Sequence, residues 1–125
     1  MTVRRILLVD DDPDIRQIAE LSLRRIGKFE VELAASGPEA LAAAARQAPD
    51  LVLLDVSMPG MDGPATLAGL RATSPVPVVF FTATSSDEEV ARLCALGAVA
   101  VIPKPFDVAA LPRQVRDILS KIGLD

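Results

Sequence analysis

The sequence of residues 51–55 is Leu-Val-Leu-Leu-Asp, an uninterrupted apolar run that ends in a carboxylate. A short apolar run without alternation is typical of a strand buried on both faces of a parallel sheet. The carboxylate lies at the carboxyl end of that strand, and this is the edge of an open parallel sheet at which ligands bind. Residues 51–55 therefore predict a buried strand that delivers Asp55 to a functional site.

Four other segments have the character of strands. Residues 6–9, 78–81 and 98–102 are continuous apolar runs, whereas residues 29–33 alternate as Phe-Glu-Val-Glu-Leu, which is typical of an edge strand with one wetter face. Pro103 closes the last run, and because proline cannot donate to a strand ladder, that strand is also expected at an edge. The apolar runs alternate with helical patterns. We therefore predict an α/β fold, a doubly wound (βα)5 sheet of five parallel strands in the flavodoxin-like order 2-1-3-4-5.

Several helix boundaries can be predicted from the sequence. Asp12 followed by proline is typical of an N-cap, and Ser36 and Ser86 each precede a glutamate by three residues, as in a capping box. The first helix is expected to bury an apolar stripe made of Ile15, Ile18, Ala19, Ser22 and Ile26. Pro112 leaves two alternatives for the last helix, which either begins near Leu111 or has a distorted first turn from Asp107.

Composition narrows the class of protein. The chain has 125 residues, of which 50% are hydrophobic, so we expect one packed domain. A net charge of −4 with scattered basic residues argues against a nucleic-acid surface, and no apolar stretch is long enough to cross a membrane. The absence of histidine removes histidine-based catalysis. Cys94 cannot form an intrachain disulfide and is expected to be a buried, inert thiol.

The residues that follow the apolar runs form a candidate site. Asp10 and Asp11 follow the first run, Asp55 the third, Thr82 the fourth, and Lys104 comes shortly after the fifth. Taken singly, each has an ordinary structural explanation as a turn former, a strand end or a surface residue. Together the carboxylates would crowd like charges and raise at least one pKa, and a hard divalent cation such as Mg²⁺ would relieve that repulsion. The sequence therefore predicts a magnesium site.

Four motifs in this order resemble the receiver domain of bacterial two-component response regulators, which is CheY-like. The motifs are residues 8–12 (Leu-Val-Asp-Asp-Asp), residues 53–63 (Leu-Leu-Asp-Val-Ser-Met-Pro-Gly-Met-Asp-Gly), residues 81–83 (Phe-Thr-Ala) and residues 103–106 (Pro-Lys-Pro-Phe). The resemblance extends over essentially the whole chain, residues 1–125. It implies a signalling phosphoacceptor that catalyses only its own phosphorylation and dephosphorylation, with a cytoplasmic location.

The resemblance also implies roles for individual residues. Asp55 would accept a phosphoryl group from a histidine kinase or a histidine phosphotransfer protein. Mg²⁺ would be bound by Asp11, Asp55 and the backbone carbonyl of Ser57, with Asp10 acting through water. Lys104 and Thr82 would hold the phosphoryl oxygens, and the Lys104–Pro105 peptide bond would be cis.

One position departs from the family, since Val101 stands where many receivers carry Tyr or Phe. We therefore expect the signal to travel through the backbone of residues 82–86 and the following helix, not through an aromatic rotamer. The output would be a changed contact with a target protein or a homodimer formed by the last two helices.

The sequence leaves one alternative function open, makes a second remote and excludes a third. The chain could be the N-terminal part of a longer regulator with a DNA-binding or enzymatic output domain. An aspartate-nucleophile phosphatase is a remote alternative. Those enzymes resemble one another in the motif Asp-x-Asp-x-Thr/Val after the first strand, and here the fifth position of that motif is Asp14. A flavodoxin is excluded by charge, because its first loop must accommodate a phosphate and the loop here is Asp-Asp-Asp-Pro-Asp.

Overall fold

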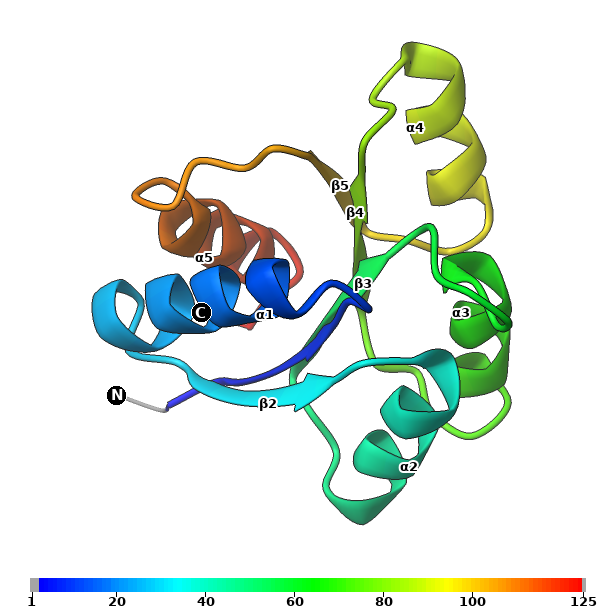
Figure 1. Ribbon diagram of the computed structural model, residues 1–125, viewed down its shortest axis with the longest axis horizontal. Coiled ribbons are helices and arrows are strands. Elements are labelled where there is room, and N and C mark those ends of the chain that lie inside the picture. Colours follow the sequence, from blue (N-terminus) through cyan, green and yellow to red (C-terminus); the bar gives the residue numbers. More distant parts are fainter. Residues whose placement is uncertain (1–2, 125) are drawn as a thin grey trace.

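The computed structural model describes residues 3–124 and contains one five-stranded parallel sheet in the order β2-β1-β3-β4-β5 (Figure 1). The strands are β1 (Arg5–Val9), β2 (Glu30–Ala34), β3 (Leu51–Asp55), β4 (Val78–Thr82) and β5 (Ala100–Pro103). The helices are α1 (Pro13–Leu21), α2 (Gly37–Arg46), α3 (Gly63–Arg71), α4 (Asp87–Ala95) and α5 (Leu111–Lys121), and a π-helical turn, η1 (Ser22–Ile26), continues α1. The predicted fold class, strand order and edge strands are confirmed.

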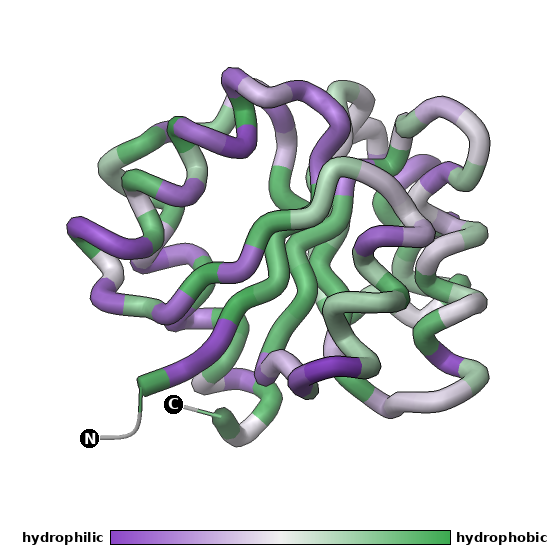
Figure 2. The backbone as a smooth tube through the Cα atoms, turned by 60° about the horizontal axis from the view of Figure 1, so that its bottom comes forward, coloured by the Kyte–Doolittle hydropathy of each residue, from purple (hydrophilic) through white to green (hydrophobic). Residues whose placement is uncertain are grey.

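The helices cover both faces of the sheet, and each face has its own apolar core. Helices α1 and α5 lie on one side of the sheet, and α2, α3 and α4 lie on the other (Figure 1). Successive residues of β1 point to opposite faces, so Ile6 and Leu8 belong to the first core and Leu7 and Val9 to the second. The continuous apolar colour of the central strands in Figure 2 reflects this burial on both faces. No helix within residues 3–124 is long and apolar enough to cross a membrane.

The predicted helix starts are confirmed. The Asp12 carboxylate accepts a hydrogen bond from the Asp14 backbone N–H at 2.9 Å, and the hydroxyls of Ser36 and Ser86 each accept one from the N–H three residues on, at 3.2 Å. Helix α5 begins at Leu111, which is the first of the two predicted alternatives. Pro112 therefore lies in the first turn, where its missing N–H has no intrahelical partner to lose.

Three predictions of burial or extent were wrong. Ile18 and Ile26 are 44% and 54% exposed, whereas Ala19 and Ser22 of the predicted stripe are buried. Leu23 is buried as well, in the π-helical turn η1, whose pitch differs from that of an α-helix. Cys94 is exposed; its neighbour Leu93 is the buried residue of α4, and adjacent helical residues point about 100° apart. The fifth strand begins at residue 100, two residues later than the apolar run suggests.

Gly63 connects the fold to the candidate site, and we expect Gly63→Ala to destabilise the protein. A Cβ atom at this position would lie 2.5 Å from the backbone oxygen of Asp55 and 2.8 Å from Cα of Val56. Both contacts are with backbone, so the end of β3 would have to shift. The expected loss of unfolding free energy is about 1–3 kcal/mol. Chemical denaturation measures it, with Gly60→Ala as a comparison, where the space is open but φ is +75°.

Candidate functional site at the carboxyl edge of the sheet

Four neighbouring strands deliver the predicted site residues to one edge of the sheet. Asp55 and Thr82 are the last residues of β3 and β4, and Asp55 pairs with Phe81, the residue before Thr82. Asp10 and Lys104 each directly follow the last residue of a strand. The backbone N–H of Lys104 donates to the carbonyl oxygen of Thr82 at 2.8 Å, so the two segments stay together beyond the sheet. The peptide bond between Lys104 and Pro105 is cis, as predicted.

The Lys104 ammonium group lies between two buried carboxylates. Its Nζ is 2.7 Å from Oδ2 of Asp10 and 3.2 Å from Oδ1 of Asp55. The side chain of Asp10 is 0% exposed and that of Asp55 is 9% exposed, whereas that of Lys104 is 18% exposed. Charge-assisted bonds of this kind are strong because little water competes for them. The sequence predicted that Lys104 would come to this end of the sheet, but not that its ammonium group would bond directly to both carboxylates.

Burial and neighbouring charges shift the pKa values of Asp55 and Lys104. Burial raises the pKa of Asp55, the negative charge of Asp10 raises it further, and Lys104 offsets only part of this effect. Burial acts to lower the pKa of Lys104, but its hydrogen bond to Asp10 and the two negative charges outweigh burial, so that pKa is raised. Lys104 therefore compensates the ionised form of Asp55 only in part.

Asp11 adds a third carboxylate to this group. One oxygen each of Asp10, Asp11 and Asp55 can be chosen so that all three lie within 4.8 Å of one another. Asp11 is exposed, which keeps the cluster open to solvent on one side. Hard carboxylate oxygens with room for water are the donor set that Mg²⁺ prefers, so the residues present fit this cation.

Thr82 and Ser57 lie at the same edge and have local hydrogen bonds. The Thr82 hydroxyl donates to the backbone oxygen of Thr84 at 2.9 Å and accepts from its N–H at 3.1 Å. The Ser57 N–H donates to Oδ1 of Asp55 at 3.4 Å. The Thr82 hydroxyl is therefore engaged with the loop after β4, and it would have to leave the Thr84 carbonyl to donate to a group bound at Asp55.

Arg16 is a contributor that the sequence analysis missed. Its guanidinium donates from α1 to the backbone oxygen of Asp10 at 2.6 Å, and the N–H of Asp12 donates to Oδ1 of the same residue at 2.9 Å. Both bonds hold Asp10 in place. The only signal in the sequence was the position of Arg16, one helical turn after the N-cap Asp12.

Comparison with known proteins agrees with this geometry. The family model "Response regulator receiver domain" matches residues 6–116. The transcriptional activator protein PfeR of Pseudomonas aeruginosa is 39% identical over 121 residues, which cover 97% of this chain and 39% of the relative. The transcriptional regulatory protein PrrA of Mycobacterium tuberculosis is 42% identical over 125 residues, covering 98% of this chain and 53% of the relative. The chain thus spans about half, or less, of the length of these curated relatives.

Solved structures are also similar. The chemotaxis response regulator CheY4 of Vibrio cholerae superimposes with a TM-score of 0.87 at 35% identity, covering 94% of this chain and 100% of that one. A putative response regulator from Chloroflexus aurantiacus gives a TM-score of 0.85 at 34% identity, with coverage of 95% and 99%. On the strength of the match to residues 6–116, this chain belongs to the response regulator receiver domain family.

Proposed function

We propose that residues 1–125 form one receiver domain in which Asp55 accepts a phosphoryl group from a phosphohistidine. The donor would be a histidine kinase or a histidine phosphotransfer protein. The observation that carries the proposal is the position of the Asp55 carboxylate, which lies at the end of a central strand, 3.2 Å from the Lys104 ammonium and beside two further carboxylates. A chain with these features is a signalling phosphoacceptor whose only chemistry is its own phosphorylation and dephosphorylation.

The chemistry requires positioning and charge neutralisation more than proton transfer. An oxygen of Asp55 forms a bond to phosphorus while the bond between phosphorus and the donor imidazole breaks, and the product is an acyl phosphate on Asp55. Lys104 lies within reach of the new phosphoryl oxygens, and Thr82 supplies a hydroxyl donor from the neighbouring strand. This matches the way phosphoryl transfer is catalysed elsewhere, by orientation and electrostatic stabilisation.

Asp10, Asp11, Asp55 and the backbone carbonyl of Ser57 would hold Mg²⁺. When bound, this cation supplies positive charge that offsets the negative charge of the carboxylates and of the phosphoryl oxygens. The raised pKa of Asp55 supports the assignment, because burial and the Asp10 charge leave the ionised carboxylate incompletely compensated. The structure thus supports a cation site at the place where the phosphoryl group would be accepted.

Exposure to a small acyl phosphate such as acetyl phosphate tests the proposal. With Mg²⁺ present, intact-mass analysis is expected to show a single phosphoryl adduct, and with a chelator in its place the adduct should be absent or far slower to form. A chain that stays unmodified with Mg²⁺ while its fold is intact contradicts the proposal. So does an adduct that forms equally fast in the presence of the chelator.

Signal transmission is expected to begin at Thr82. When the hydroxyl donates to a phosphoryl oxygen, it releases the Thr84 carbonyl oxygen, so residues 82–86 and the start of α4 should rearrange. Val101 has no ring that could rotate inward in response. Crystal structures with and without a phosphoryl mimic measure the change, and an unchanged course of residues 82–86 would show that this prediction is wrong.

The surface around α4 supports the proposed output. Leu96 and Val99, which lie between α4 and β5, are 48% and 41% exposed. This exposed apolar pair lies at the end of α4 opposite residues 82–86, and it would offer a contact to a target protein or to a second copy through the last two helices. A location in the cytoplasm is proposed, as for other members of the family.

A longer protein is the second candidate, because the curated relatives are about twice as long as this chain or longer. One of them is named DNA-binding response regulator MtrA, from Mycolicibacterium smegmatis, and this chain covers 49% of it. In such a protein the receiver would regulate an attached output domain. Binding to DNA by the receiver itself is not proposed.

A further inference from the structure

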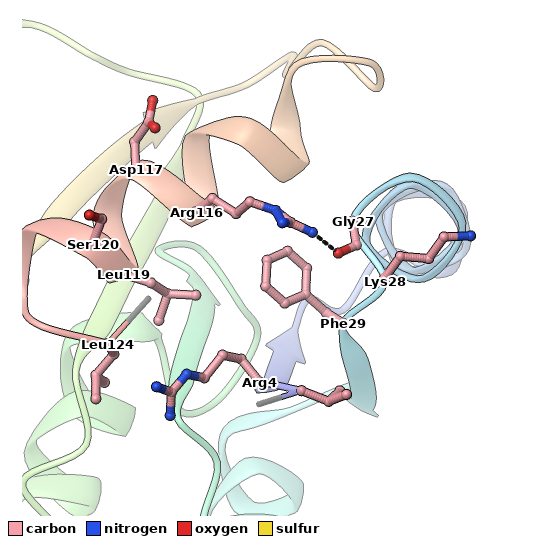
Figure 3. A pocket seen from close by; sticks show the side chains of 10 residues that line it. Arg4, Gly27, Lys28, Phe29, Arg116, Asp117, Leu119, Ser120 and Leu124 are labelled. Carbon is pink, nitrogen blue, oxygen red and sulfur yellow. Dashed lines mark hydrogen bonds between the residues drawn. The ribbon is translucent and has the colours of Figure 1, made fainter. Parts of the chain in front are cut away.

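A cavity lies at the opposite end of the sheet from Asp55. It has a volume of about 420 Å³ and is formed where the start of β1, the segment between η1 and β2, and α5 meet (Figure 3). Small-molecule sites commonly have volumes of roughly 300–1,000 Å³. None of the residues proposed for phosphoryl transfer contributes to its lining. The cavity therefore needs an explanation of its own.

The inner part of the cavity is apolar and the rim is cationic. Phe29 and Leu119 are 7% and 1% exposed and form the inner part, with Leu124 beside them. The guanidinium of Arg116 lies over the Phe29 ring, 5.2 Å from its centroid, and donates to the backbone oxygen of Gly27, as Figure 3 shows. Because a guanidinium has five N–H donors, the bond to Gly27 leaves it capacity to bind an anion.

The residues that line the cavity carry a net positive charge, whereas the protein as a whole carries a net negative charge. Arg4, Lys28 and Arg116 line it together with a single acidic residue, Asp117, whereas the chain has a net charge of −4. Arg4 is 3.7 Å from Asp50, but neither Lys28 nor Arg116 forms an ion pair with any residue between 3 and 124. Arg116 therefore lies over the apolar part of the cavity without an ion-pair partner among residues 3–124, whereas the Lys28 ammonium points away from the Phe29 ring in Figure 3.

The backbone around the cavity is irregular in two ways. The π-helical turn η1 interrupts the end of the first helix, and such turns occur frequently at functional sites. Lys28 then adopts a φ of +60°, the left-handed region in which glycine is preferred. Lys28 directly follows the end of this turn, where the Phe29 N–H donates to the Leu23 carbonyl oxygen at 3.1 Å, and a left-handed residue is common at such a helix end. Its ammonium group points away from Phe29 and Arg116 in Figure 3.

We propose that this cavity binds a small organic anion that has an aromatic or branched apolar body and one carboxylate, sulfonate or phosphate group. The apolar body would enter beside Phe29 and Leu119, and the anionic group would face the guanidinium of Arg116. The proposal does not depend on phosphorylation of Asp55. The proposed occupant is a small molecule, and occupation of the cavity by a second copy of the chain would contradict this.

Anilinonaphthalene sulfonate is a suitable probe, because it joins an aromatic body to a single anionic group. Phenylnaphthylamine has the same body without the sulfonate and is the matched neutral probe. We expect the sulfonate to bind with enhanced fluorescence and the neutral compound to bind at least about tenfold more weakly, a difference that corresponds to 1.4 kcal/mol. In amide NMR spectra, the sulfonate should shift Gly27, Lys28, Phe29 and Ser120, and it should leave the region of Asp55 unchanged.

Three variants separate a built site from adventitious binding. Arg116→Gln removes the cationic group that lies over the Phe29 ring, and it should weaken the sulfonate about fivefold or more. Lys28→Gly removes a charge that points away from this ring, with a glycine that suits the positive φ, and it should change binding little. Lys121→Gln removes the same charge from α5 outside the cavity and should leave binding unchanged.

The proposal is overturned if the sulfonate shifts mainly residues around Leu96 and Val99, or if the neutral probe binds equally well. Equal weakening by Lys121→Gln also overturns it, since that result would show a general charge effect. So does a concentration-dependent dimer in sedimentation that Arg116→Gln dissociates and the probe does not, because the cavity would then be occupied by a second copy.

Discussion

Replacement of Asp55 by Asn is expected to abolish the phosphoryl adduct formed with acetyl phosphate and Mg²⁺. Asparagine has nearly the same shape but lacks the carboxylate oxygen that would attack phosphorus. Intact-mass analysis measures the loss directly. Asp12→Asn is the matched control, because Asp12 is an exposed N-cap in the loop after β1, at the same edge of the sheet, and asparagine caps a helix about equally well. The Asp12→Asn protein should form the phosphoryl adduct to the same extent as the unsubstituted protein.

The same substitution should not weaken the fold. Burial and the Asp10 charge raise the pKa of Asp55, which means that the folded state disfavours the ionised carboxylate at neutral pH. A neutral side chain removes that unfavourable contribution, although Lys104 loses one of its two partners. We expect the free energy of unfolding to be equal or higher. An adduct of unchanged yield in a folded Asp55→Asn protein would contradict the assignment of Asp55.

Replacement of Lys104 by Met is expected to cause the largest loss of stability among the site variants. It removes the ammonium group that contacts both Asp10 and Asp55 and leaves two buried carboxylates without this partner. Removal of one partner from a buried ion pair costs about 3–5 kcal/mol. Lys104 is partly exposed, so we expect about 2–4 kcal/mol at neutral pH with a chelator present, measured by urea denaturation. Lys121→Met, on the exposed side of α5, is the control and should change little.

Added Mg²⁺ shows whether this loss of stability comes from uncompensated carboxylates or from lost packing of the lysine side chain. If the cost comes from uncompensated carboxylates, added Mg²⁺ should restore part of the stability, because a ligand that binds only the folded state stabilises it. The double variant Asp55→Asn with Lys104→Met should cost less than Lys104→Met alone, since one of the opposed charges has gone. A loss that neither Mg²⁺ nor the second substitution reduces would show that packing of the lysine stem matters instead.

The sequence alone determined the fold because its signals are local and mutually consistent. Residues 51–55 form a fully buried strand as predicted, and the caps at Asp12, Ser36 and Ser86 begin helices where expected. Strands that alternate with helices leave few ways to build a parallel sheet. The carboxyl ends of those strands meet at one edge, so the order of motifs also predicted that Asp10, Asp11 and Asp55 would come together.

Only the tertiary structure decided what depends on side chains from distant segments. Lys104 is 94 residues from Asp10 in the chain, and nothing local indicates that it is bonded to this carboxylate. Gly27 and Arg116 are likewise 89 residues apart in the chain, and their hydrogen bond lies in the lining of a cavity that no motif suggests. The physical reason is that periodicity fixes which face of an element is buried, whereas the distances between charged groups follow from how the elements pack. Asp55 was thus predictable from the sequence, but its partial neutralisation by Lys104 and the cationic cavity at the far end of the sheet were not.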